Sequence, residues 1–173
     1  MGFFVIPYFV ALVGWAAHVF FDRKPNKRTR HRIVELALLW VLVFFGAWAI
    51  LGAFGHLSGQ SGETAADIGY AQSMFQWEVG WGDVTVGVLG IGCAWVVLRD
   101  NWMTAAVVAV AISYGGDAIG HIMEYVADDN TAPDNVWAIP SDIVEPLLAI
   151  ALLIAYRLGE RRLRAPGRAP SVG

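Results

Sequence analysis

The stretch GGDAIGHIMEY, residues 115–125, places three ionisable side chains on a helix candidate that is otherwise apolar. At about 100° per residue, Asp117, His121 and Glu124 fall within about 60° of one another and form one polar stripe. The surrounding segment, residues 102–126, has the length and composition of a membrane-spanning helix. An ionisable group that is unpaired inside a bilayer costs several kcal/mol, so the stripe predicts polar partners on neighbouring helices.

The composition of the whole chain is typical of an integral membrane protein. Of its 173 residues, 57% are hydrophobic and only 16% are charged, and the mean hydropathy is positive. The net charge of −3 gives no support to nucleic-acid binding. The single cysteine, Cys93, excludes an intramolecular disulfide and a cysteine-based zinc site. Gly116 and Gly120 have a small-xxx-small spacing, which predicts close packing of their helix against a neighbour.

Five apolar segments alternate with short polar ones, which predicts an all-α, polytopic membrane protein. The expected transmembrane helices cover about residues 2–21, 33–55, 75–98, 102–126 and 139–156, and the last four form a four-helix core. The first segment is interpreted as a retained helix, because no basic residue precedes it and no small-residue cleavage site follows it. Thr64 and Asp67 indicate a short interfacial helix after the second span. We expect one transmembrane domain, residues 1–157, and a disordered basic cytoplasmic tail, residues 158–173.

The distribution of charge predicts the orientation in the cell membrane. All 12 Lys and Arg lie in the loop between the first two spans, at Arg99, or from Arg157 onward. Under the positive-inside rule these segments are cytoplasmic, so the N-terminus is expected outside and the C-terminus inside. Every acidic residue except Asp22, Glu35, Asp100 and Glu160 falls in the outer half of a span or in an outer loop.

The outer halves of the second to fifth spans bring histidine and carboxylate side chains to the same end of the bundle. At 1.5 Å per residue these side chains lie roughly 3 to 13 Å below the outer ends of their spans. They are Glu78, Asp83, Asp117, His121, Glu124, Asp142 and Glu145, with His56 at the end of the second span. Imidazole and carboxylate ligands without thiolate suit zinc, iron or manganese. Glu78 and Asp83 lie about 140° apart on their helix, so only one of them is expected to face the centre.

Simpler interpretations apply to several of these residues. Asp142 follows Pro140 and Ser141, a context in which a carboxylate caps a helix start. Glu124 is shallow enough to be solvated, and a hydrogen bond to Asp117 would explain His121 as well as metal ligation does. Buried carboxylic acids also hydrogen-bond across helices in membrane bundles without binding any ion.

Short motifs along the second to fifth spans resemble a family of small bacterial and archaeal integral membrane proteins known only as a domain of unknown function. The resemblance covers about residues 54–152. The motifs are Gly55-His56, Phe75-Gln76 with Glu78 and Gly80, Gly87-Val88-Leu89-Gly90, Gly120-His121-Ile122, Asn130 with Ala132-Pro133 and Asn135, and Asp142-Ile143 with Pro146. The resemblance implies that His56, Glu78, His121 and Asp142 are family positions, one from each core helix. The resemblance implies no activity. The family pattern does not include Asp83, Asp117, Glu124 and Glu145, which are additions in this chain.

These observations predict a membrane protein with an outward-facing site. We expect this site to bind a divalent metal, Zn, Fe or Mn, through His56, Glu78, His121 and Asp142. If the site is catalytic, Asp117 or Glu145 would carry the proton. One alternative is an ion or proton transport module, although residues 84–98 and 102–116 of the third and fourth spans contain no ionisable side chain. Another is a haem protein that uses His56 and His121. The sequence names no substrate or reaction, and it leaves open a homo-oligomer or a complex with another membrane protein.

Overall fold

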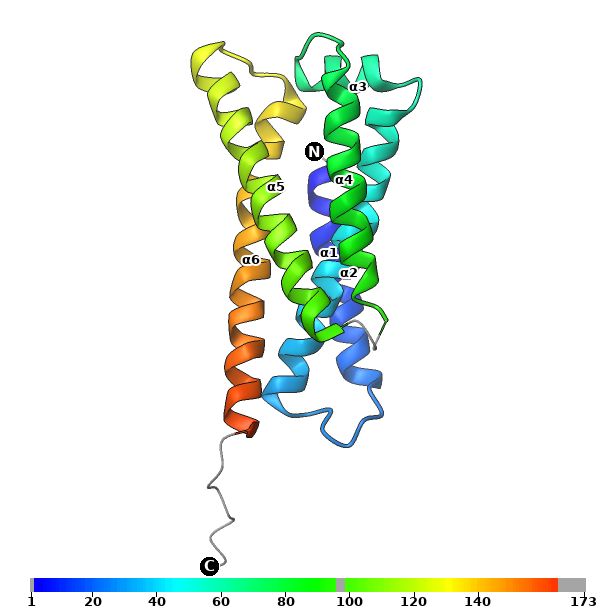
Figure 1. Ribbon diagram of the computed structural model, residues 1–173, viewed down its shortest axis with the longest axis vertical. Coiled ribbons are helices and arrows are strands. Elements are labelled where there is room, and N and C mark those ends of the chain that lie inside the picture. The colour runs from blue at the N-terminus through cyan, green and yellow to red at the C-terminus, as the bar shows by residue number, and fades with distance from the viewer. Residues whose placement is uncertain (1, 96–98, 165–173) are drawn as a thin grey trace, which may run out of the picture.

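The computed structural model describes residues 2–95 and 99–164, and these residues form an elongated bundle of helices (Figure 1). The all-α prediction is confirmed, since the described residues contain helices and turns and no strand. The helices are α1 (Gly2–Phe21), α2 (Arg30–Leu57), α3 (Ser61–Ile68), α4 (Phe75–Gly92), α5 (Arg99–Ala127) and α6 (Pro133–Arg164).

Four of these helices, α1, α2, α5 and α6, are long and apolar enough to cross a membrane. The chain is therefore a polytopic membrane protein by the length and composition of its helices. The third predicted span, residues 75–98, is represented by α4, which has 18 residues and ends at Gly92. Its polar residues and glycines lower its hydropathy, but it lies beside α2 through the body of the bundle (Figure 1). Residues 96–98 of the predicted third span lie outside the described residues.

Glycines allow α2 and α4 to pack backbone against backbone. A Cβ added at Gly46 of α2 would lie 2.9 Å from the Cα of Gly90 and 3.0 Å from the carbonyl oxygen of Gly87. No side chain fits at these positions, so the two helices form one rigid pair.

The second helix pair, α5 and α6, does not use glycine in this way. A Cβ added at Gly116 or Gly120 would meet nothing within 4 Å. The prediction that these two glycines pack closely against a neighbour is therefore wrong. They line a partly open cavity, and their lack of side chains leaves space in it.

The half of the bundle on the side of the α1–α2 loop is a packed apolar core. Leu36, Leu38 and Leu42 of α2 belong to one buried apolar cluster with Met103 of α5 and Ala149 of α6. At this end Arg32 forms buried ion pairs with Asp22 (2.8 Å) and Glu35 (2.8 Å), which fix the α1–α2 loop against α2.

The polar end of α6 is longer than expected. The helix continues to Arg164, so residues 158–164, predicted as part of a disordered tail, are helical. Ion pairs from Glu160 to Arg157 (2.7 Å) and Arg164 (3.4 Å), three and four residues away, stabilise this last turn. Residues 165–173 of the predicted tail lie outside the described residues.

The predicted short helix after the second span is confirmed as α3, although it begins at Ser61. Gly69 ends it in a left-handed conformation (φ 83°), and its N–H donates to the carbonyl of Ala66. Asn130, in the α5–α6 connection, donates to the carbonyl of Ile68 (3.0 Å). This contact ties α3 over the end of the bundle opposite the α1–α2 loop (Figure 1).

Candidate functional site

A cavity of about 510 Å³ lies at the α3 end of the bundle, between the α2–α4 pair and the α5–α6 pair. Six carboxylates line it, from Asp67, Asp83, Asp117, Asp134, Asp142 and Glu145, together with His56 and His121. No Lys or Arg occurs among the described residues that line it. The cavity is therefore electrically suited to a positively charged ligand.

On the α5–α6 wall, His121 is held by the buried amide of Asn135. The Nδ1 of His121 lies 2.7 Å from the Asn135 Oδ1, and Asn135 is fully buried. The Asn135 Nδ2 donates to the carbonyls of Asn130 (3.0 Å) and His121 (3.4 Å), which fixes the orientation of the amide. Because Oδ1 is an acceptor, His121 donates from Nδ1, and in the neutral ring Nε2 carries a lone pair.

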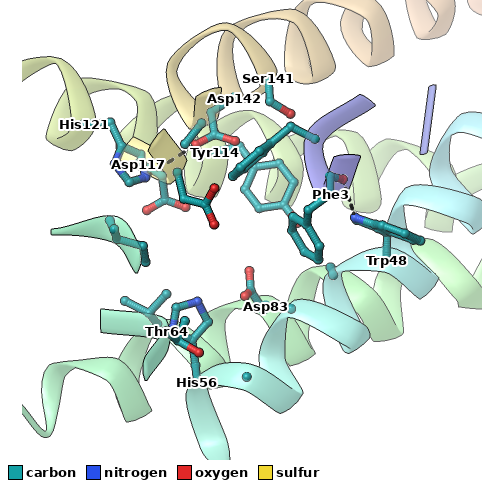
Figure 2. A pocket seen from close by; sticks show the side chains of 18 of the residues that line it. Phe3, Trp48, His56, Thr64, Asp83, Tyr114, Asp117, His121, Ser141 and Asp142 are labelled. Atoms are coloured by element: carbon teal, nitrogen blue, oxygen red, sulfur yellow. Dashed lines mark hydrogen bonds and ion pairs between the residues drawn. The ribbon is translucent and has the colours of Figure 1, made fainter. Parts of the chain in front are cut away.

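The lone pair of His121 faces a carboxylate. Its Nε2 lies 3.9 Å from the Asp142 Oδ2, which is too long for a direct hydrogen bond. Asp117, one turn before His121 on α5, lies beside this pair (Figure 2). Two hydrogen-bond acceptors, the His121 Nε2 and the Asp142 carboxylate, thus face each other across a gap. The Asp117 carboxylate lies next to this gap.

The opposite wall carries His56 and Asp83. The Nδ1 of His56 lies 2.6 Å from the Oε1 of Gln76. Gln76 is only 2% exposed. Figure 2 shows His56 and Asp83 across the open space from Asp117, His121 and Asp142. A Cβ added at Gly52 would lie 3.4 Å from the Asp83 Oδ2, so α2 passes close to this carboxylate.

Three of the four predicted metal ligands lie in the lining of the cavity. His56, His121 and Asp142 line the cavity, as do the additional acids Asp83, Asp117 and Glu145. Glu78 does not line the cavity and is exposed. At about 100° per residue, Glu78 lies roughly 200° from Gln76, so burying Gln76 beside His56 turns Glu78 outward. Of these two acidic residues of α4, Asp83 faces the cavity.

Glu124 also lies outside the cavity. Its Oε2 accepts a hydrogen bond from the Asn130 Nδ2 (3.4 Å), so it supports the loop that holds α3. Among the described residues, no three His, Cys, Asp or Glu side chains form a ready-made metal site. The histidine and acidic side chains are instead divided between two walls.

The base of the cavity contains an unpaired carboxyl oxygen. Glu145 is 5% exposed, and its Oε1 has no hydrogen-bond partner in the described structure. Tyr114 and Ser141 line the cavity near it, and the Tyr8 hydroxyl donates to the Ser141 carbonyl (3.0 Å). A buried oxygen without a hydrogen-bond partner costs free energy, so a ligand that offers a hydrogen-bond donor or a cation would be stabilised at this position.

An aromatic wall closes the cavity on the side of α1, a helix that the sequence placed outside the core. Phe3 and Phe4 of α1 and Phe45 and Trp48 of α2 line it. The rings of Phe3 and Trp48 lie 5.3 Å apart, and the Trp48 indole N–H donates to the Phe3 carbonyl (2.9 Å). These contacts hold the start of α1 against the site.

Sequence reasoning assigned no role to Gln76, Asn135 or Tyr70. Gln76 and Asn135 stood among the motif residues, and an amide in an apolar segment is itself a signal of a buried polar partner. Tyr70 lines the cavity from the loop after α3, with its ring 6.2 Å from that of His121. Burial and the negative charges of Glu124 and Asp117 raise the pKa of the Tyr70 hydroxyl.

Fold and cavity together define an all-helical membrane protein with a partly open cavity lined by acidic, histidine and aromatic side chains. The chain belongs to DUF6790, a family of unknown function whose model matches residues 1–162. This confirms the expected membership of an uncharacterised family and extends the match to α1. No curated protein and no solved structure matches the chain.

Proposed function

We propose that the protein is a cell-membrane protein that binds a divalent metal ion, Zn, Fe or Mn, in this cavity. The observation that carries the proposal is the gap between the His121 Nε2 and the Asp142 Oδ2. Two ligands of one ion, each about 2.1 Å from it, lie roughly 3 to 4 Å apart. The separation of 3.9 Å falls in that range.

The surroundings of His121 support the same proposal. A metal-ligating histidine usually donates its other ring N–H to a protein acceptor, which orients the ring and fixes the tautomer. Asn135 performs this role for His121, and Gln76 contacts the corresponding nitrogen of His56. Asp117 lies beside this pair on the same wall and would supply a third ligand, and His56 faces them from the opposite wall.

The alternatives have less support. A channel needs a continuous polar path, whereas the apolar core of α2, α5 and α6 lies between the cavity and the α1–α2 loop. A haem carries two propionates, which would lie among carboxylates without a lysine or arginine to pair them. Every Lys and Arg lies in the first loop and the start of α2, at Arg99, or from Arg157 onward in the sequence, and this distribution supports a cytoplasmic C-terminus and a cavity that faces outward.

Metal analysis of the purified protein tests the proposal. The wild type, incubated with Zn, Mn or Fe(II) and desalted, should retain about one ion per chain of at least one of these metals. Asp142→Asn and His121→Ala should each weaken metal affinity by about tenfold to a hundredfold or more. His18→Ala is the matched control, because His18 lies outside the cavity and accepts from the Trp40 indole N–H (3.1 Å).

A wild type that retains none of the three metals would overturn the proposal. So would Asp142→Asn binding as tightly as the wild type, since this near-isosteric change removes a charged ligand with little change of shape. An absorption spectrum without a haem band would exclude the haem alternative in the same preparation.

A further inference from the structure

We propose that the base of the cavity is a separate binding site for an organic ammonium ion that carries an apolar group. Its ammonium group would lie against Glu145 and Asp83, and its apolar part against the aromatic wall of Phe3, Phe45 and Trp48. Neither His121 nor a metal ion forms part of this site.

Glu145 supplies an unpartnered hydrogen-bond acceptor for this site. It is more than nine-tenths buried, yet its Oε1 is unpartnered within the described structure. On α6 it lies three residues beyond Asp142, about 4.5 Å further from the α3 end, so it is distinct from the His121–Asp142 gap. An ammonium N–H donor would satisfy this oxygen.

The shape of the cavity favours an organic cation at this position. A volume of about 510 Å³ far exceeds the space that one ion needs and lies within the range of small-molecule sites. Aromatic rings are not metal ligands, but their faces attract ammonium groups and their area binds apolar substituents. Figure 2 shows Tyr114 and Phe3 extending into the space between Asp142 and Asp83, so rings and carboxylates face the same volume.

The charge of the lining distinguishes a free amine from a phospholipid. A phosphatidylethanolamine headgroup also offers an ammonium group, but its phosphate would lie among six carboxylates with no Lys or Arg among the described lining residues. We therefore assign the site to a free amine.

Calorimetric titration of the full-length protein in nanodiscs without phosphatidylethanolamine tests the assignment, with phenethylammonium as the probe. We expect saturable binding, and binding of the neutral 2-phenylethanol about tenfold weaker or more. Glu145→Gln should weaken phenethylammonium binding by at least about tenfold. Glu78→Gln is the matched control, since Glu78 is exposed outside the cavity and should bind as the wild type does.

Three results would overturn the assignment: no binding up to about 10 mM probe, equal binding of the alcohol, or unchanged binding by Glu145→Gln. The metal content of Glu145→Gln separates the two proposals, because this variant should keep its metal while it loses the amine. If Glu145→Gln does not fold, Trp48→Leu takes its place and should weaken phenethylammonium binding more than it changes metal content. Metal binding without amine binding would leave the proposed function standing and remove this site.

Discussion

At the scale of single residues, buried side chains of this protein are positioned by specific polar partners. His121 is oriented by Asn135, His56 by Gln76, and the basic loop by Asp22 against Arg32. In each case one partner is almost fully buried, at 0%, 2% and 3% exposure for Asn135, Gln76 and Arg32. Substitution of any of these buried partners should therefore remove a specific hydrogen bond or ion pair.

The Asp22–Arg32 contact predicts a pH dependence of stability. The hydrogen bond from Arg32 holds the pKa of the Asp22 carboxyl below its usual value. Because the folded-state pKa is the lower one, this contact stabilises the fold above about pH 4 and is lost as the pH falls through the folded pKa. Asp22→Asn should lower the thermal unfolding midpoint at pH 7 and show a smaller further loss between pH 5 and pH 3 than the wild type.

Thermal unfolding in detergent, followed by circular dichroism across this pH range, measures the effect. Glu63→Gln, on the exposed face of α3, serves as the control and should follow the wild type. Parallel curves for Asp22→Asn and the wild type would show that this carboxyl does not contribute to the acid sensitivity.

At the scale of helices, glycine has two opposite uses. In α2 and α4 it removes side chains so that two backbones can touch, and in α5 it leaves space in the cavity. The spacing of Gly116 and Gly120 is the one expected for close helix packing. Only the position of the neighbouring helix decides whether such glycines allow close packing or leave space in a cavity.

The two kinds of glycine should respond oppositely to alanine. Gly120→Ala meets nothing within 4 Å, and alanine favours the helix, so it should stabilise the protein by about 0.5–1 kcal/mol. Gly46→Ala places a methyl group 2.9–3.0 Å from the α4 backbone and should destabilise it by about 1–3 kcal/mol. Unfolding midpoints of the two variants measure the difference, and equal tolerance of both would contradict the α2–α4 packing.

At the scale of the whole molecule, two helix pairs diverge at one end and close at the other. The α2–α4 and α5–α6 pairs enclose the cavity at the α3 end, and the apolar core closes the bundle toward the α1–α2 loop (Figure 1). This asymmetry follows the charge distribution, since most acidic residues lie toward the open end and the described basic residues lie toward the closed end. The arrangement suits a binding site that is reached from one side of the membrane.

Cysteine labelling in intact cells tests which side that is. In a Cys93→Ala background, Gln72→Cys in the α3–α4 loop should react with a membrane-impermeant maleimide, because this exposed position lies at the cavity end. Asn26→Cys in the α1–α2 loop should react only after the cells are opened. The reverse pattern would place the cavity on the cytoplasmic side and would contradict the predicted orientation.

The sequence by itself determined the helical membrane class, the polar character of one end and the family. These properties follow from local composition and from periodicity, which each segment carries regardless of its neighbours. The histidine and carboxylate positions His56, His121 and Asp142 could be placed at one end of the bundle by counting along each span.

Only the tertiary structure decided which polar residues face one another. It turned Glu78 outward and Asp83 inward, assigned Gln76 and Asn135 to the two histidines, and brought α1 with Phe3 into the cavity wall. The physical reason is that the rotation of each helix about its own axis is set by packing against other helices. In α4 the contact of Gly87 and Gly90 with α2 fixes that rotation, and no pattern within α4 alone specifies it.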